Sequence, residues 1–175
     1  MPKRPEKKNN QQTVDLAFLP EALLVKINDV FDRYFKLGFS RNTQVIDEDN
    51  IPNFPNNVSS LSSAEVGDFH ARYTAWYSYV NDKLKYLKVA LMVVDKEAEQ
   101  TMNTEIVNIT MDVTKKYTVS EKEAKAKISQ GYMAISSYKM QLETLVSMLE
   151  RDMDSYDKNI TTLSREFSRR EHGGF

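Results

Sequence analysis

One long stretch decides the fold of this chain: SSAEVGDFHARYTAWYSYVNDKLKYLKVALMVVDKEAEQTMNTEIVNITMDV, residues 62–113. Apolar side chains recur along it in 13 steps over 47 residues, a mean spacing of 3.6. That period is typical of a straight α-helix with one buried face. The sequence therefore predicts one helix over residues 63–113. The apolar stripe consists of Val66, Phe69, Tyr73, Trp76, Val80, Leu84, Leu87, Leu91, Val94, Ala98, Met102, Ile106, Ile109 and Val113.

The start of this helix is marked by a capping box. Ser62 and Glu65 have the spacing at which the hydroxyl accepts from the N–H of Glu65 and the carboxylate reaches back. Leu61 and Val66 occupy the positions of a hydrophobic staple. We expect the helix to begin directly after Ser62.

A second long helix is predicted over residues 121–170. A capping box at Ser120 and Glu123, with Val119 and Ala124 as its staple, begins it, and His172-Gly173-Gly174 ends it. Apolar side chains then repeat every seven residues, as in a coiled coil. They are Ile128, Ile135, Leu142, Leu149, Tyr156 and Leu163.

The two predicted helices are nearly equal in length, each roughly 75 Å at about 1.5 Å per residue. Only about seven residues separate them, so the chain must turn back on itself. We therefore predict an all-α fold: a long, coiled-coil-like antiparallel helical hairpin over residues 61–172. Residues 1–13 are expected to be a flexible basic arm, and residues 14–60 a short helix from Pro20 to Leu37 followed by an extended connector.

Composition excludes several classes of protein. The 24 basic and 25 acidic residues give a net charge of −1, and the chain has no cysteine, which removes disulfide scaffolds and thiolate metal sites. Phosphate-binding loops and hydrolase or metalloprotease motifs do not occur in the sequence. His70, next to the stripe residue Phe69, is expected on the helix surface. We predict no enzyme, cofactor or metal, and, without a long apolar run, no membrane contact and a cytoplasmic location.

Charge is unevenly distributed, and the connection between the long helices is basic. Residues 114–130, called the tip below, carry five lysines against Glu121 and Glu123, a net charge of +3. Lysines can contact phosphates, and an aromatic ring can stack on a base of single-stranded nucleic acid. The alternative is an ordinary soluble turn. The candidate nucleic-acid-binding residues of the tip are Lys115, Lys116, Tyr117, Lys122, Lys125 and Lys127.

Two further candidate sites lie on the long helices. Arg165, Arg169 and Arg170 form a second candidate anion site, although cations at a helix C-terminus also complement the helix dipole. Tyr77 and Tyr79 fall off the apolar stripe, so we expect them to pack against the short helix or a partner subunit.

Residues 69–170 resemble the UvsY-type recombination mediators of tailed bacteriophages. The likeness rests on Trp76, Tyr79, the lysines from Lys115 to Lys127, and the segment Ser164-Arg165-Glu166-Phe167-Ser168-Arg169-Arg170. The resemblance implies a ring-forming homo-oligomer that binds single-stranded DNA and helps to load a recombinase, in the host cytoplasm if the chain is phage-encoded.

Two other functions remain open on the sequence. A helical hairpin with a partly uncovered apolar face also suits a virion, scaffold or adaptor protein that acts only through protein–protein contacts. A small regulator that docks one helix in a partner's groove is the third possibility.

Overall fold

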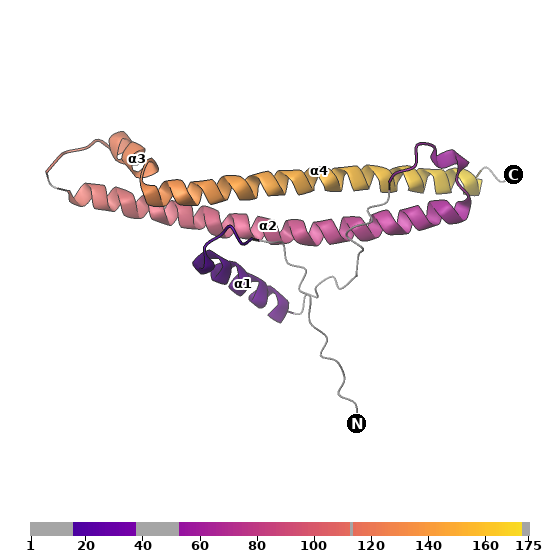
Figure 1. Ribbon diagram of the computed structural model, residues 1–175, viewed down its shortest axis with the longest axis horizontal. Helices are drawn as coiled ribbons and strands as arrows, with labels where there is room; N and C mark the ends of the chain where they lie inside the picture. The colour runs from indigo at the N-terminus through magenta and orange to yellow at the C-terminus, as the bar shows by residue number, and fades with distance from the viewer. Residues whose placement is uncertain (1–15, 38–52, 113, 173–175) are drawn as a thin grey trace, which may run out of the picture.

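The computed structural model describes residues 16–37, 53–112 and 114–172, and within them every regular element is helical (Figure 1). These elements are α1 (Glu21–Lys36), the 3₁₀-helix η1 (Val58–Ser60), α2 (Ser63–Met111), α3 (Val119–Lys127) and α4 (Gln130–His172). Helices α2 and α4 run antiparallel and pack along one another, which confirms the predicted all-α hairpin. The predicted arm and most of the predicted connector lie outside the described residues.

The capping box at the start of α2 is confirmed. The Glu65 N–H donates to Ser62 Oγ at 3.2 Å, and the Ser62 N–H donates to Glu65 Oε2 at 2.6 Å. These two bonds lower the pKa of Glu65. Leu61 packs in the same apolar cluster as Val66, as a hydrophobic staple requires.

The apolar stripe of α2 forms the seam of the hairpin. Toward the open end, where α2 begins and α4 ends, Val66 and Tyr73 pack with Leu163. Further along, Trp76 packs against Tyr156, with ring centroids 6.4 Å apart. In the central part of the seam, α2 and α4 also pack against α1 and the residues just before it. The buried residues there are Leu16, Leu19, Leu23, Ile27, Leu84, Leu87, Ala90, Val94, Leu142 and Val146.

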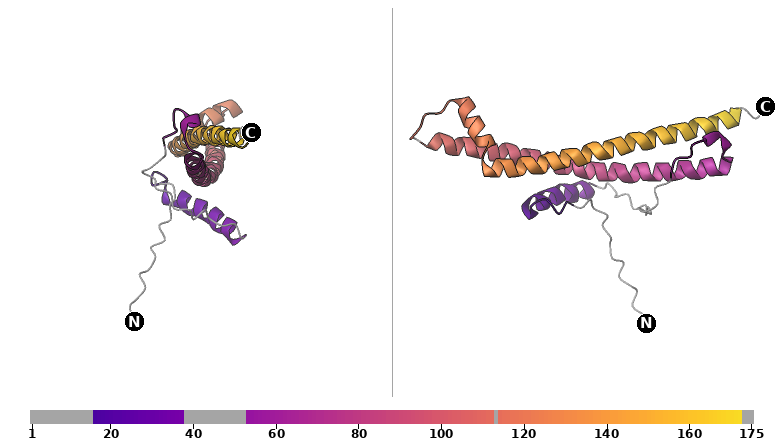
Figure 2. Two further views of the ribbon diagram at one scale, coloured as in Figure 1. Left: turned by 90° about the vertical axis from the view of Figure 1, so that its right-hand side faces the viewer. Right: turned by 45° about the horizontal axis from the view of Figure 1, so that its top comes forward.

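Helix α1 lies within the predicted short helix from Pro20 to Leu37 and covers the middle of α2 (Figure 2). Leu23 and Ile27 are its buried side chains. The ring of Phe31 stacks on Tyr86 of α2 with centroids 4.7 Å apart, and Lys26 forms an ion pair with Glu97. The apolar face of α1 is thus used against the hairpin.

The second half of the hairpin differs from the prediction. Where one helix was expected over residues 121–170, the structure has two helices, α3 and α4. The capping box is at Thr118 and Glu121, two residues before the predicted one: Thr118 Oγ1 accepts from the Glu121 N–H at 3.3 Å. Helix α3 then ends, and the Ser129 hydroxyl accepts from the Tyr132 N–H at 3.2 Å as α4 begins. Ile128, the expected first member of the buried heptad, lies in this break and is 72% exposed.

The far end of α2 also differs slightly from the prediction. The helix ends at Met111, and the Asp112 side chain accepts hydrogen bonds from Thr114. These bonds lower the pKa of Asp112 and form a local turn. The chain therefore leaves helical geometry before residue 113.

No helix within the described parts of the chain is both long enough and apolar enough to span a bilayer.

Candidate nucleic-acid interface

The tip lies at the closed end of the hairpin, where α3 folds beside the ends of α2 and α4 (Figure 1). Ala126 is the buried side chain of α3, so α3 contacts the long helices through a small residue and its long polar side chains stay toward solvent. Lys115 and Lys116 are exposed in the loop before α3, and Lys125 and Lys127 are exposed on it. The structure thus places the five predicted lysines at one end, with Lys122 half-buried.

A tip carboxylate is held by the local fold. Glu121 accepts from the backbone N–H of Thr118 at 2.8 Å and from the Thr118 hydroxyl at 2.9 Å. These hydrogen bonds lower the pKa of Glu121, so it stays ionised as a helix cap. It compensates the N-terminus of α3 and does not pair with a lysine in the described structure.

Tyr117 is half-buried and is covered on one side by Lys125. The Lys125 ammonium lies 4.0 Å from the ring centroid and donates to Tyr117 Oη at 2.8 Å. This is a cation–π contact combined with a hydrogen bond. A base that stacks on Tyr117 must therefore use the other face of the ring or displace the ammonium.

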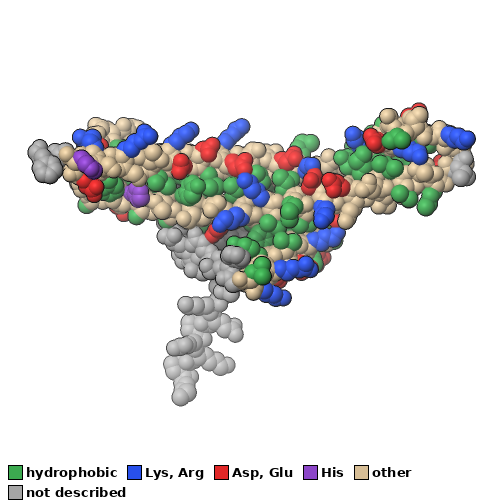
Figure 3. Space-filling view, turned by 180° about the vertical axis from the view of Figure 1, so that it is seen from behind, with side chains coloured by type: hydrophobic (Ala, Val, Ile, Leu, Met, Phe, Trp, Pro, Cys, Tyr) green, Lys and Arg blue, Asp and Glu red, His purple; other side chains and the backbone are tan. Residues whose placement is uncertain are grey.

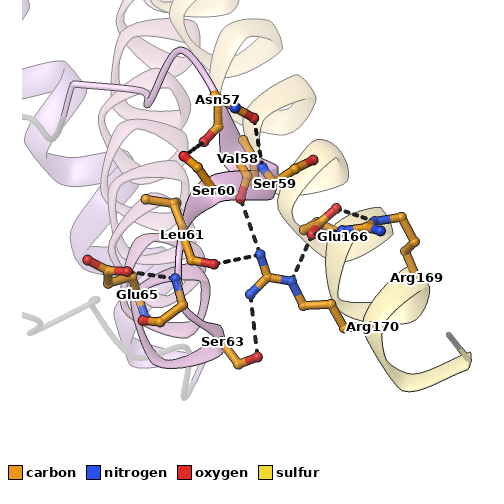
Figure 4. A network of polar contacts seen from close by, with 11 residues as sticks. Asn57, Val58, Ser59, Ser60, Leu61, Ser63, Glu65, Glu166, Arg169 and Arg170 are labelled. Atoms are coloured by element: carbon orange, nitrogen blue, oxygen red, sulfur yellow. Dashed lines mark hydrogen bonds and ion pairs between the residues drawn. The ribbon is translucent and has the colours of Figure 1, made fainter. Parts of the chain in front are cut away.

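The open end holds a polar network that the sequence prediction missed (Figure 4). Glu166, only 8% exposed, accepts from Arg169 Nε at 2.8 Å and from Arg170 Nε at 2.7 Å. These bonds, led by the one from Arg169, lower the pKa of Glu166 to about 2. The carboxylate is thus ionised and shared by two guanidinium groups.

Arg170 also bridges the two rods. Its Nη2 donates to the carbonyl oxygens of Leu61 at 2.7 Å and Val58 at 3.3 Å, and its Nη1 donates to Ser63 Oγ at 3.4 Å (Figure 4). The group therefore fixes η1 and the start of α2 to the end of α4. Arg169 and Arg170 of the second candidate anion site thus have an internal carboxylate as partner. Arg165, the third residue of that candidate site, is exposed.

The spacing of Glu166 is the signal that could have revealed this network. It precedes the two arginines by three and four residues, positions at which a carboxylate and a guanidinium meet on one helix face. The carbonyl partners of Arg170 come from a distant loop and carry no such signal.

The two candidate interface tyrosines are half-buried on α2. The ring of Tyr79 meets Trp76 edge-on, with centroids 5.6 Å apart, and lies 5.0 Å from the Lys83 ammonium. The ring contact with α1 is made by Tyr86 instead. A contact of Tyr77 and Tyr79 with a partner subunit stays a prediction.

His70 does not lie on the open surface as predicted. It is half-buried, its Nε2 lies 3.1 Å from Ser164 Oγ, and its ring meets Phe167 edge-on. The residue forms part of the contact between α2 and α4. Across residues 16–37, 53–112 and 114–172, no group of three or more His, Cys, Asp or Glu side chains is arranged to hold a metal ion.

Fold and charge together define a class: an all-α, two-rod hairpin with a lysine-rich closed end. Comparisons of the chain with protein-family models, with curated proteins and with solved structures each found no match.

Proposed function

We propose that this protein is a non-enzymatic accessory protein that binds single-stranded DNA at the tip. As in the recombination mediators it resembles, it would act as a homo-oligomer together with a recombinase in the cytoplasm. The observation that carries the proposal is the concentration of five lysines between residues 115 and 127 at one exposed end of the rod.

Phosphate binding by such a cluster is favoured mainly by counterion release. Each lysine that neutralises a phosphate frees a condensed cation, so affinity falls steeply with added salt. Tyr117 favours single strands over duplexes, because unpaired bases are free to stack on an aromatic ring. The near-neutral charge of the whole chain does not oppose this, since binding depends on the local field around the tip.

The first prediction concerns the exposed tip lysines. The triple variant K115Q/K116Q/K127Q should bind a fluorescent oligothymidylate on the order of 100-fold more weakly than the wild type at 0.1 M salt. Removing three phosphate contacts should also reduce the salt slope of log K by about 2, at about 0.7 per contact. Fluorescence anisotropy over a salt series measures both quantities.

The matched control removes three cations elsewhere. R33Q/K36Q/K96Q changes exposed cations of α1 and α2 and alters the net charge by the same amount. It should bind like the wild type. If the wild type fails to bind at low salt, the proposed function is wrong.

A second candidate function is favoured by exposed apolar side chains around the tip. Val107, Met111, Val119 and Ile128 are all at least half exposed. Exposed apolar groups at one end of a rod suit a contact with another protein, as in a virion or assembly adaptor. Such a contact would be insensitive to salt, which distinguishes it from phosphate binding.

A further inference from the structure

The outward side of α4 carries a continuous row of exposed residues without a single acidic member. Its residues recur in steps of three or four over 36 positions, which is about 54 Å of helix. We call this the outer row. It consists of Met133, Ser137, Met140, Thr144, Ser147, Arg151, Ser155, Lys158, Thr162, Arg165 and Arg169, all exposed.

The outer row lies opposite the hairpin seam. Buried Leu142 is two residues from both Met140 and Thr144, which is about 200° around a helix of 3.6 residues per turn. The row therefore takes no part in the packing of α4 on α2. Apart from Arg169, which pairs with Glu166, its composition is not explained by the stability of the hairpin.

The half of the outer row nearer the open end is basic. Arg151, Lys158 and Arg165 are seven residues apart, about 10 Å at each step, and Arg169 follows. Within the described structure these first three have no ion pair, whereas Lys139 pairs with Asp95 on α2. Figure 3 shows basic side chains spaced along the upper edge of the rod, with acidic side chains close below them.

The half nearer the tip is uncharged but partly apolar. Met133 and Met140 are 57% and 64% exposed, and the residues between and beyond them in the row are Ser or Thr. Thioethers are polarisable and make favourable contacts with aromatic rings. The row thus begins beside the tip with groups suited to bases and continues with groups suited to phosphates.

We infer that a single strand of nucleic acid bound at the tip continues along the outer row toward the open end, with its phosphates on Arg151, Lys158 and Arg165. This inference rests on the proposed function. A straight line of cations fits a flexible single strand, which can follow it. A duplex fits it poorly, because each of its backbones winds away and returns only after a helical turn of about 34 Å.

The test removes the three unpaired cations of the row. R151Q/K158Q/R165Q should bind an oligothymidylate of about 20 nucleotides on the order of 100-fold more weakly at 0.1 M salt, with the salt slope reduced by about 2. An oligonucleotide of about 5 nucleotides, near the lower end of known single-strand site sizes, should bind the variant and the wild type alike, because it is covered by the tip. R33Q/K36Q/K96Q is the control for lost charge, and circular dichroism checks that the variants fold.

The outcomes separate this inference from the proposed function. If the row variant binds the long oligonucleotide like the wild type while the tip variant does not, the outer row is not a binding site and the proposed function stands. Equal losses in the row variant and the control also overturn the inference, as does equally tight binding of a duplex of the same length. If the wild type binds neither oligonucleotide at low salt, both proposals fail.

Discussion

Replacement of Leu142 by alanine is expected to lower the free energy of unfolding by about 2–5 kcal/mol, the range found for large-to-small changes in a core. Leu142 is fully buried, in the cluster that joins α1, α2 and α4. Removing the Leu142 side chain leaves a cavity. Because α2 and α4 pack against each other along their length, they cannot easily move together to fill it. For a chain of this size the melting temperature should fall by about 2–4 °C per kcal/mol.

The control is two residues away on the same helix. Met140 belongs to the outer row and is 64% exposed, so Met140→Ala should change stability by no more than about 0.5 kcal/mol. Thermal melts followed by circular dichroism measure both variants. Similar losses in the two variants would mean that the seam is not where the structure places it.

Much of the fold could be predicted because α2 is one uninterrupted periodic pattern. A stripe that keeps a spacing of 3.6 over 47 residues leaves the helix only one face to bury. A short connection to a second helix of similar length then permits only an antiparallel partner. The contact of Trp76 with Tyr156, in the half of the hairpin nearer its open end, follows directly from that geometry.

The break between α3 and α4 could not be predicted from the same kind of pattern. Thr118 and Ser120 each have a glutamate three residues later, so the sequence offers two overlapping capping boxes. Ile128 also fits the heptad of α4 by residue type alone. The choice is made by tertiary packing, in which buried Ala126 lets α3 lie beside the rods and Ser129 begins a new helix.

The candidate sites also differ in how far the sequence alone could predict them. A cluster of lysines can be read from the sequence, because long cations stay exposed wherever the chain turns. The arginines near the C-terminus could not be assigned so simply. Whether Arg170 meets a ligand or the carbonyls of Val58 and Leu61 depends on where a loop more than 100 residues earlier is placed.

The polar network at the open end leads to a prediction about pH. Glu166→Gln should lower the melting temperature at pH 7, because the amide carries no charge for Arg169 and Arg170. In the folded protein the pKa of Glu166 is lowered to about 2 from an ordinary value of 4.5. The stability that this carboxylate contributes is therefore fully present above about pH 4.5 and is lost as the pH falls through about 2.

The difference in melting temperature between the wild type and Glu166→Gln should accordingly be constant from pH 7 to about pH 5 and shrink between about pH 4.5 and 2. Glu171→Gln is the matched control, since Glu171 is exposed at the same end of α4 and its replacement should leave the melting temperature close to that of the wild type. A constant difference for Glu166→Gln down to pH 2 would mean that the lost stability reflects side-chain packing and not the charge. In that case the two arginines would not depend on Glu166, and Arg169 and Arg170 would again be candidates for binding an external anion.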